Sequence, residues 1–381
     1  MATTPAAPQQ LNPAQIAQLS AQAQSLTLGS QLFNKIIQNL SAPALGAIIR
    51  NQINNVGIVT DLDIEVNLTL TNTSATNVIS GPSNHAPFSL FSNIQFKDYS
   101  QYARIDVSGY QLYLNNWQRY GYKYGAAYSG ALIPNFDILP ATIPVNSSVN
   151  VTFVLRVPLA YNPRGDLRGA LLAQRNTGEA FLNFTLNTLA ALQTGNDAFY
   201  SVNAAGLGVA VNSINLYQNY YLPYVSNGQY LLPTQQLGVV YEVNGQLATT
   251  SNISGGVEKL IDYQTQRQVL SQTVQFYNTT TGSNVANAIT ADFAKVRLIA
   301  NTSQTLNEWT PNRLVASYRN MFKDDLPNDV IYIPSLPPVN TELYGQVQLG
   351  LTPAAGVTGG IMEVMSETMF NTGSPLSGSI Q

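Results

Sequence analysis

Charged side chains are scarce in this sequence. Lys, Arg, Asp and Glu together make up 10% of its 381 residues, and the formal net charge is −3. Ordinary soluble domains carry about 25% charged residues, so the charges here are few rather than unbalanced. Since charge normally keeps a monomer dispersed, we infer that other copies of the chain cover much of the surface. The 45% of apolar residues suffices for sizeable cores and excludes disorder as the main state.

Cysteine is absent and histidine occurs once. The lack of cysteine excludes disulfides, thiolate nucleophiles and Cys-ligated zinc. The single histidine, His85, lies in the turn-rich stretch Gly81–Pro87, and one histidine cannot supply a multi-histidine metal site within a chain. We interpret it as a loop residue without a catalytic role. Because no glycine-rich phosphate loop or other catalytic motif occurs, the sequence predicts a protein that is not an enzyme and needs no cofactor.

Sequence signals for membrane insertion, secretion or nucleic-acid binding are also missing. No apolar run approaches the roughly 18 residues that indicate a membrane span. The first ten residues, MATTPAAPQQ, lack the basic and apolar regions of a secretion signal. Lys and Arg do not cluster as a nucleic-acid interface requires, so we expect no direct contact with nucleic acid.

Residues 1–55 form a distinct segment whose only charges are Lys35 and Arg50. The pair Asn12-Pro13 predicts the start of a helix, with asparagine as N-cap and proline at the first helical position. We therefore expect an N-terminal helical arm that precedes the main body of the protein.

Two apolar stripes with helical spacing follow in this arm. The first contains Ile16, Leu19, Ala23 and Leu26. The second follows Gly29 and contains Leu32, Phe33, Ile36, Ile37 and Leu40. Both stripes predict amphipathic helices. Such an arm either packs against the body of the protein or lies on a lipid surface, and the lack of basic residues on its polar face favours packing.

From residue 56 the apolar period changes to two, which is typical of β-strands. The stretch Ile58–Thr71 alternates almost without fault and places Asp61, Asp63 and Glu65 on one face. We interpret this face as solvated or covered by another subunit. A calcium site is the alternative, because hard cations bind carboxylate oxygens.

Further short strands are predicted in two runs separated by a stretch without periodicity. The first run contains Ile94–Lys97, Arg104–Val107, Val149–Val157, Phe181–Leu186 and Val209–Tyr217. The second contains Leu237–Val243, Gln268–Tyr277, Lys295–Ile299, Asp329–Ile333, Tyr344–Leu351 and Gly360–Ser366. Short strands without alternating helices predict an all-β protein of sandwiches or barrels. We expect domains at 56–220 and 236–367, a linker at 221–235 and a flexible tail at 368–381.

Short helices are predicted inside both runs. Tyr110, Tyr113, Trp117 and Tyr120 share one helical face after Ser108-Gly109. In the second run, Thr310-Pro311 opens a helix that carries Leu314, Tyr318 and Met321. A later helix in the first run is predicted after Asp166 as N-cap, with Leu167, Leu171 and Leu172 on its face. The repeated order of strands and helices suggests a duplicated domain.

Four segments with distinctive motifs follow one another in the chain. They are the arm with LNPAQIAQL (Leu11–Leu19), the approach to the first strand (Asn55–Val59), VPLAY with DLRGALLA (Val157–Tyr161 and Asp166–Ala173), and Trp309–Ile333 with KDDLP. Taken in this order, they resemble the major capsid protein of tectiviruses, which are phages with an icosahedral shell around an internal membrane. The stretch VPLAY…DLRGALLA is the most specific of the four, and the region from Gly245 to Ala294 matches least.

The resemblance implies two consecutive eight-stranded jelly rolls, with an N-terminal helical arm and short inserted helices. It also implies a homotrimer that forms pseudo-hexagonal capsomers, located in the virion and assembled in the host cytoplasm. The implied partners are further copies of the chain, minor capsid and vertex proteins, and the internal viral membrane. The resemblance places the arm near that membrane, through the apolar residues Ile16, Leu19, Leu26, Leu32, Phe33, Ile36 and Ile37.

The alternative functions belong to other classes. A sugar-binding β-sandwich or receptor-binding spike would use exposed rings of the aromatic cluster Tyr110–Tyr128, although helical spacing is more typical of a core or a subunit interface. A hydrolase with two facing carboxylates also stays open, because the 20 Asp and Glu residues do not exclude it.

Overall fold

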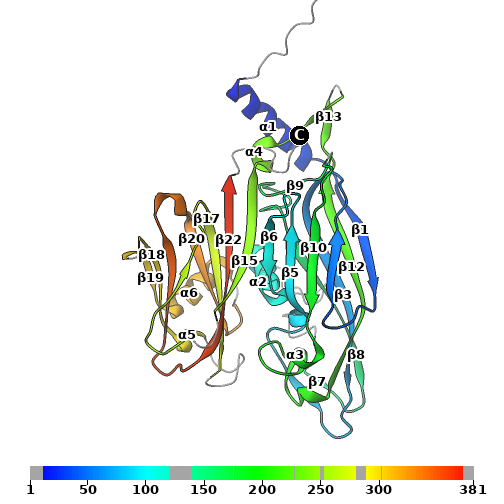
Figure 1. Ribbon diagram of the computed structural model, residues 1–381, viewed down its shortest axis with the longest axis vertical. Coiled ribbons are helices and arrows are strands. Elements are labelled where there is room, and N and C mark those ends of the chain that lie inside the picture. The colour runs from blue at the N-terminus through cyan, green and yellow to red at the C-terminus, as the bar shows by residue number, and fades with distance from the viewer. Residues whose placement is uncertain are drawn as a thin grey trace, which may run out of the picture.

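The computed structural model describes residues 12–120, 139–174, 176–226, 228–248, 253–279, 289–301, 303–323 and 325–371. Two β-sandwiches stand side by side with their strands running along the same long axis (Figure 1). Residues 1–11 and 372–381 lie outside the described residues. The start of the predicted flexible tail at residue 368 is wrong, because residues 368–371 belong to a β-strand that ends at Asn371.

The first sandwich is built from two four-stranded layers. One layer has the order β1-β12-β3-β8, and the short β9 also pairs with β3. The other layer has the order β2-β10-β5-β6. The strand bounds are β1 Leu32–Ser41, β2 Ile48–Gln52, β3 Ile58–Asn72, β5 Phe91–Lys97, β6 Ala103–Val107, β8 Ser148–Pro158, β9 Leu171–Leu172, β10 Phe181–Leu186 and β12 Leu207–Tyr221. Their inward-facing apolar side chains form one continuous core, as the alternating pattern of β3 and β8 predicts.

The second sandwich repeats this plan with layers β15-β22-β17-β20 and β16-β21-β18-β19. Its strands are β15 Val239–Ala248, β16 Lys259–Asp262, β17 Gln268–Asn278, β18 Phe293–Ala300, β19 Gln304–Trp309, β20 Val330–Asn340, β21 Val347–Pro353 and β22 Gly360–Asn371. It has its own apolar core. Two layers of four strands in each unit agree with the prediction of two eight-stranded jelly rolls.

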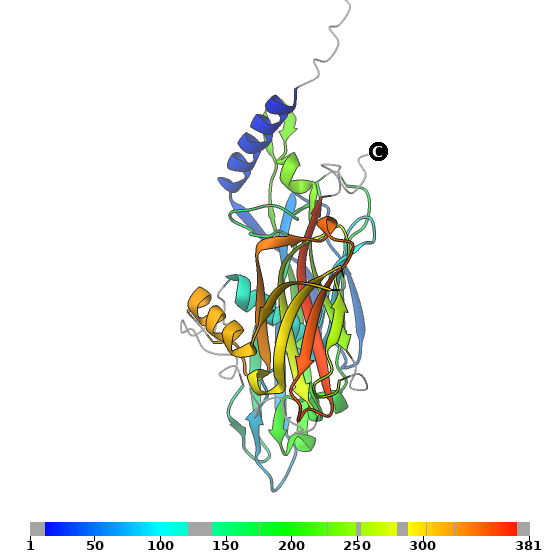
Figure 2. The same ribbon diagram turned by 90° about the vertical axis from the view of Figure 1, so that its left-hand side faces the viewer.

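Two small sheets and several short helices lie outside the two sandwiches. The sheets are β11-β4-β7 and β13-β14, with strands β4 Ile79–Pro82, β7 Thr142–Ile143, β11 Tyr200–Val202, β13 Tyr224–Ser226 and β14 Gln229–Leu231. The helices are α1 Pro13–Leu28, α2 Gly109–Tyr120, α3 Leu189–Gln193, α4 Thr234–Leu237, α5 Ile289–Asp292 and α6 Pro311–Phe322. Helices α2 and α6 lie on the same side of the molecule, and α1 projects beyond one end (Figure 2).

Local sequence signals explain both ends of α1 and the start of α6. The Asn12 side chain accepts from the Gln15 amide at 2.8 Å and the Gln15 side chain accepts from the Asn12 amide at 2.9 Å, with Pro13 at the first turn. At the other end the amide of Gly29 donates to the carbonyl of Ser25 at 3.0 Å. Thr310 caps α6 in the same way as Asn12 caps α1, ahead of a proline. These predicted boundaries are confirmed.

The predicted helix through Leu32–Leu40 is wrong, because this stretch is strand β1. It pairs antiparallel with β12 from Leu32↔Tyr221 to Ser41↔Ser213, and the register shifts between Ile36 and Gln38. Such a bulge interrupts the strict alternation of a strand, so the apolar spacing imitates a helix. Pairing with a long neighbouring strand satisfies the backbone groups that a helix would satisfy within itself.

The predicted helix after Asp166 is also wrong. Leu171 and Leu172 form the short strand β9, paired with Val59 and Ile58. The Asp166 carboxylate accepts from the backbone amide and guanidinium of Arg168 instead of capping a helix. Gly169 has φ +91°, a left-handed conformation that ends any helical run.

Candidate functional site: the barrel junction and the arm

The two barrels share a continuous β-sheet. Strand β6 of the first barrel pairs in parallel with β15 of the second, with Ile105 opposite Val243 and Asp106 opposite Asn244. The two inner layers thereby join into one eight-stranded sheet that crosses both barrels. We call the surfaces that meet along β6, β15, β22 and α2 the barrel junction.

A buried ion pair lies in this junction. Arg119, in the last turn of α2, donates from Nε to Oε1 of Glu367 on β22 at 2.8 Å, with side chains 8% and 7% exposed. The same carboxylate accepts from the hydroxyls of Tyr241 at 3.1 Å and Ser271 at 2.9 Å. The guanidinium carbon lies 4.2 Å from the ring centroid of Tyr161 and 4.4 Å from that of Tyr241. Each charge thus has polar or aromatic partners, which a buried pair requires.

A second buried carboxylate, Glu242 on β15, forms a similar cluster. Arg267 donates from Nε to its Oε2 at 2.8 Å, and the hydroxyl of Thr368 donates to the same oxygen at 2.9 Å. The hydroxyl of Tyr102, from the first barrel, donates to Oε1. Burial, together with the neighbouring Glu242, raises the pKa of Tyr102. Its phenol therefore stays protonated and keeps donating across the junction.

His85 belongs to the same junction. Its Nε2 lies 3.0 Å from Oδ2 of Asp329 and 2.8 Å from the amide nitrogen of Gln275, both in the second barrel. Its ring stacks on Tyr110 with centroids 4.1 Å apart. Both members of the His85–Asp329 pair are buried, so the pair links the two barrels inside the protein. The loop position of His85 was predicted, but its burial and its partners were not.

One further junction carboxylate faces α2. Glu363 on β22 accepts from the side-chain amide of Gln111 at 3.1 Å. Burial raises the pKa of Glu363, because a charged carboxylate loses its hydration there. The junction therefore combines apolar area with polar groups that have specific partners, and it fixes the barrels in one relative orientation.

The carboxylates of β3 do not form a solvated face. Asp61 and Asp63 are buried, and Nε of Arg156 lies 3.2 Å from Asp61 and 2.9 Å from Asp63. Asn219 donates to both, at 2.5 and 2.9 Å. Burial raises the pKa of Asp61 to about 6. The prediction of an outward, solvated face is wrong for these two residues, because β8 and β12 supply a cation and an amide that cover them.

No calcium site accompanies these carboxylates in the part of the chain that the structure describes. Among residues 12–371 outside the gaps stated above, no group of three or more His, Cys, Asp or Glu residues is placed to hold a metal ion. Arg156 already supplies the positive charge that a cation would provide.

The aromatic residues of α2 are buried, not displayed. Tyr110, Tyr113 and Trp117 all belong to the core of the first barrel, and the ring of Tyr113 stacks on Phe88 with centroids 3.8 Å apart. A sugar-binding platform requires exposed rings, so this part of the alternative function is wrong. Residues 121–128 of the cluster lie outside the described residues.

The helix of the arm packs through its small residues. Ser20, Ala23 and Thr27 of α1 are buried, and the backbone amide of Gln235 donates to Oγ of Ser20 at 3.2 Å. Helix α1 contacts α4, β13 and β14. Ile16 and Leu19 remain 44% and 38% exposed. The body of the same chain therefore leaves these two large apolar side chains of the predicted stripe exposed.

The remaining predicted arm residues are divided between two elements. Leu26 is half-buried on α1. Leu32, Phe33 and Ile37 are half-buried on β1 and Ile36 is exposed. Near α1, the hairpin end also exposes large apolar residues: Leu222, Tyr224 and Val225. Exposed apolar side chains therefore occur at the end of the molecule where α1 and β13 lie (Figure 1), and others, such as Val78, Leu189 and Val202, are exposed elsewhere. In the described residues, no helix is both long and apolar enough to cross a membrane.

The buried charges of the junction were not predicted from the sequence. Glu242 and Glu367 occur inside strongly apolar strands, VVYEVNG and MEVMSETMF, and carboxylates are almost never fully buried unless they are paired. A glutamate inside an apolar strand is therefore a sequence signal for a buried ion pair. Their partners could not be assigned, because Arg119 and Glu367 are 248 residues apart.

Comparison with known proteins agrees with this architecture. A family model described as P3 major capsid protein N-terminal matches residues 6–220, more than half of the chain. No curated protein matches the chain.

Solved structures share the fold across both barrels. The crystal structure of the STIV major capsid protein has a TM-score of 0.66 at 13% identity and covers 90% of this chain and 97% of its own. A chain of the atomic structure of Sulfolobus turreted icosahedral virus gives a TM-score of 0.65 at 14% identity, with coverages of 90% and 91%. A quasi-atomic model of the PBCV-1 virus capsid gives 0.55 at 11% identity, with coverages of 92% and 96%.

These likenesses confirm the double jelly-roll fold, and the family match adds the function. The residues that the family model matches run from the arm to the end of β12 and thus include the whole first barrel. The chain belongs to the P3 major capsid protein family and is a structural protein of a viral capsid, not an enzyme.

Proposed function

We propose that three copies of the chain associate into a capsomer with a pseudo-hexagonal outline, and that these capsomers tile an icosahedral shell around an internal membrane. The observation that carries this proposal is the barrel junction. It holds two similarly built barrels side by side with their strands along one axis (Figure 1). Three such pairs related by rotation present six similar units, and rotational symmetry closes the ring.

The scarcity of charge supports burial of the outer barrel surfaces between copies. Removing an ion from water costs several kcal/mol in a protein interior. A chain with 10% charged residues brings few ions to its interfaces, so apolar area and uncharged polar contacts can stabilise the assembly. Minor capsid and vertex proteins would contact the same shell, whereas nucleic acid would not contact this chain directly.

The arm is proposed to face the membrane of a tectivirus-like phage. Helix α1 carries no charged residue between Pro13 and Leu28 and exposes Ile16 and Leu19. Exposed apolar residues of the β13 hairpin lie at the same end. Insertion of such side chains at the headgroup boundary is favourable without any charge on the helix. Assembly would take place in the host cytoplasm.

Oligomeric state tests the capsomer directly. Size-exclusion chromatography with light scattering of the purified full-length chain should give the mass of a trimer, and negative-stain microscopy should show a six-lobed outline. A monomer that persists at micromolar concentration would contradict the proposal.

Vesicle flotation tests the arm separately. Neutral phosphatidylcholine vesicles should float with the wild-type protein, and Leu19→Gln should weaken the association by about tenfold, because it removes an exposed apolar anchor. Leu189→Gln is the matched control, since Leu189 is also a helical leucine exposed by 38% but lies on α3 at the opposite end (Figure 1). Equal flotation of both variants would contradict membrane contact through α1 while leaving the capsomer untouched.

A further inference from the structure

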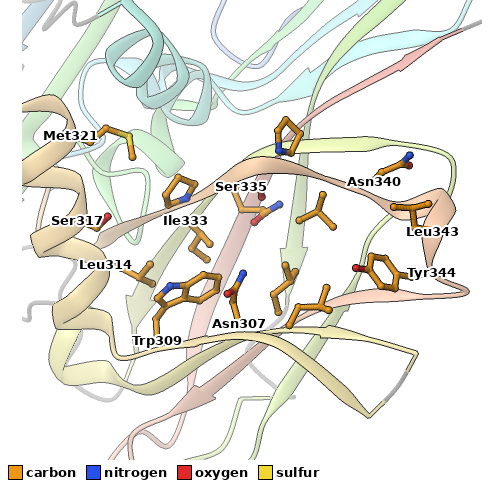
Figure 3. Close-up of a pocket in the computed structure, with 16 residues that line it drawn as sticks. Asn307, Trp309, Leu314, Ser317, Met321, Ile333, Ser335, Asn340, Leu343 and Tyr344 are labelled. Atoms are coloured by element: carbon orange, nitrogen blue, oxygen red, sulfur yellow. The ribbon is translucent and has the colours of Figure 1, made fainter.

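A cavity of about 590 Å³ opens in the second barrel between α6, β19 and β20. Figure 3 shows Leu314, Ser317 and Met321 extending from α6 and Asn307 and Trp309 from β19, opposite the strand that carries Ile333 and Ser335. Pockets that bind small molecules typically have volumes of about 300–1,000 Å³. The cavity is therefore large enough for a ligand of several heavy atoms.

One wall of the cavity contains a buried glutamine, Gln272 on β17, which is 1% exposed. Within the described part of the chain, neither its side-chain amide nitrogen nor its side-chain carbonyl oxygen has a hydrogen-bond partner. Its neighbour Thr273 faces the junction, where its hydroxyl donates to Gln118 at 2.9 Å. Because side chains alternate along a strand, Gln272 faces the interior of the second barrel, on the side of the cavity.

An unsatisfied buried amide is costly, since it has lost its water without gaining a partner. A ligand that offers one acceptor and one donor side by side would satisfy both atoms of Gln272 at once. A carboxamide has this pattern, because its carbonyl accepts while its N–H donates.

The remaining wall defines the rest of the ligand. It is mainly aromatic, aliphatic and proline side chains, and among the described residues no Lys, Arg, Asp, Glu or His lines it. A charged ligand would lose its hydration there without a counter-ion. The polar side chains that accompany Gln272 are uncharged: Asn307, Ser317, Ser335 and Asn340.

We propose that this cavity binds an uncharged, mainly apolar molecule that carries a carboxamide, and that Gln272 pairs with the carboxamide through two hydrogen bonds. The site is separate from the barrel junction and from the arm. It adds a small-molecule site to a chain whose family role is structural.

Binding of octanamide to the full-length protein tests the proposal. Saturation-transfer NMR should detect octanamide, and titration should change the emission of Trp309, which lines the cavity. Octanoate and octylammonium have the same apolar chain with a charged head, and they should bind at least tenfold more weakly. Equal binding of the three compounds, or no binding of octanamide, would overturn the proposal.

Two matched variants separate recognition from folding. Gln272→Met should weaken octanamide binding by about tenfold, the loss expected for two hydrogen bonds, without lowering the melting temperature of the free protein. Gln268→Met changes an exposed glutamine of the same strand and should leave binding unchanged. If Gln272→Met lowers the melting temperature and binds octanamide as well as wild type, Gln272 has a structural role and the proposal fails.

Discussion

Removal of Arg119 should destabilise the two-barrel unit strongly. Its partner Glu367 is 7% exposed and its carboxylate lies at the centre of the junction. Arg119→Met would leave this charge buried with only neutral donors, the hydroxyls of Tyr241 and Ser271 among them. Breaking a buried ion pair by removing one member costs about 3–5 kcal/mol, so we expect a loss of this size in the free energy of unfolding.

Urea unfolding followed by tyrosine and tryptophan emission measures this loss at fixed protein concentration. Arg319→Met is the matched control, because Arg319 occupies the last turn of α6, the corresponding helix of the second barrel. Arg319 pairs with Asp325, but their side chains are 61% and 63% exposed. Exposed pairs contribute about 0–1 kcal/mol, so this variant should unfold at nearly the wild-type urea concentration.

The double variant Arg119→Met/Glu367→Met gives the sharpest test of the reasoning. It removes both charges and fills the space with apolar side chains, which is often neutral or stabilising by comparison with the pair. We expect it to recover most of the stability that Arg119→Met loses. Equal losses of stability in Arg119→Met and Arg319→Met, or a double variant less stable than the single one, would show that the buried pair does not stabilise the junction in this way.

Two further perturbations test other buried features. The carboxyl of Asp61 has a pKa of about 6 in the folded chain against an ordinary value of 3.8, so the folded state holds this proton more tightly and stability falls as pH rises from about 4 to 6. Asp61→Asn should remove this pH dependence, so that the stability of the variant relative to wild type rises by about 3 kcal/mol between pH 4 and pH 7. If the urea midpoints of the two proteins differ by the same amount at all pH values, the assignment is contradicted. Gly169 has φ +91°, and a Cβ there would lie 2.5 Å from the carbonyl oxygen of Leu159 and 2.5 Å from Cβ of Tyr241. Gly169→Ala should therefore cost about 1–3 kcal/mol more than Gly195→Ala, whose φ is +78° but whose Cβ would meet nothing within 4 Å; equal melting temperatures would show that the close approach is unimportant.

Strand predictions succeeded where the signal is local. The alternation of Ile58–Thr71 predicts β3, which extends from Ile58 to Asn72 with its even-numbered side chains in the core. Caps and prolines likewise predict the starts of α1 and α6. Each of these features depends on residues within one or two turns of each other, so neighbours along the chain suffice to define them.

Predictions failed where a distant segment decides the conformation. Leu32–Leu40 has apolar residues at helical spacing, yet β12, about 180 residues further along, offers it a strand partner. Asp166 resembles a helix cap, yet Leu171 and Leu172 pair with the start of β3. In both cases, tertiary hydrogen bonds replace the local ones that the sequence pattern favours.

The arm was predicted in part and the junction not at all. Ile16 and Leu19 do lie on a helix, as their spacing indicates, but only the packing of Ser20 and Ala23 against the body shows which side is left exposed. The charges that were expected on outward faces include Asp61, which is buried.

By itself the sequence determined the scarcity of charge, the strand-rich class and the helix starts. Charge content is a count over the chain, and strand periodicity and helix caps depend only on neighbouring residues. The tertiary structure alone decided which of the few charges are buried and with what partner. Arg119 and Glu367 meet across 248 residues, and no local pattern encodes that distance. A buried ion is stable only when a counter-ion lies next to it. Here the counter-ion comes from a distant element, so only the complete fold brings the two charges together.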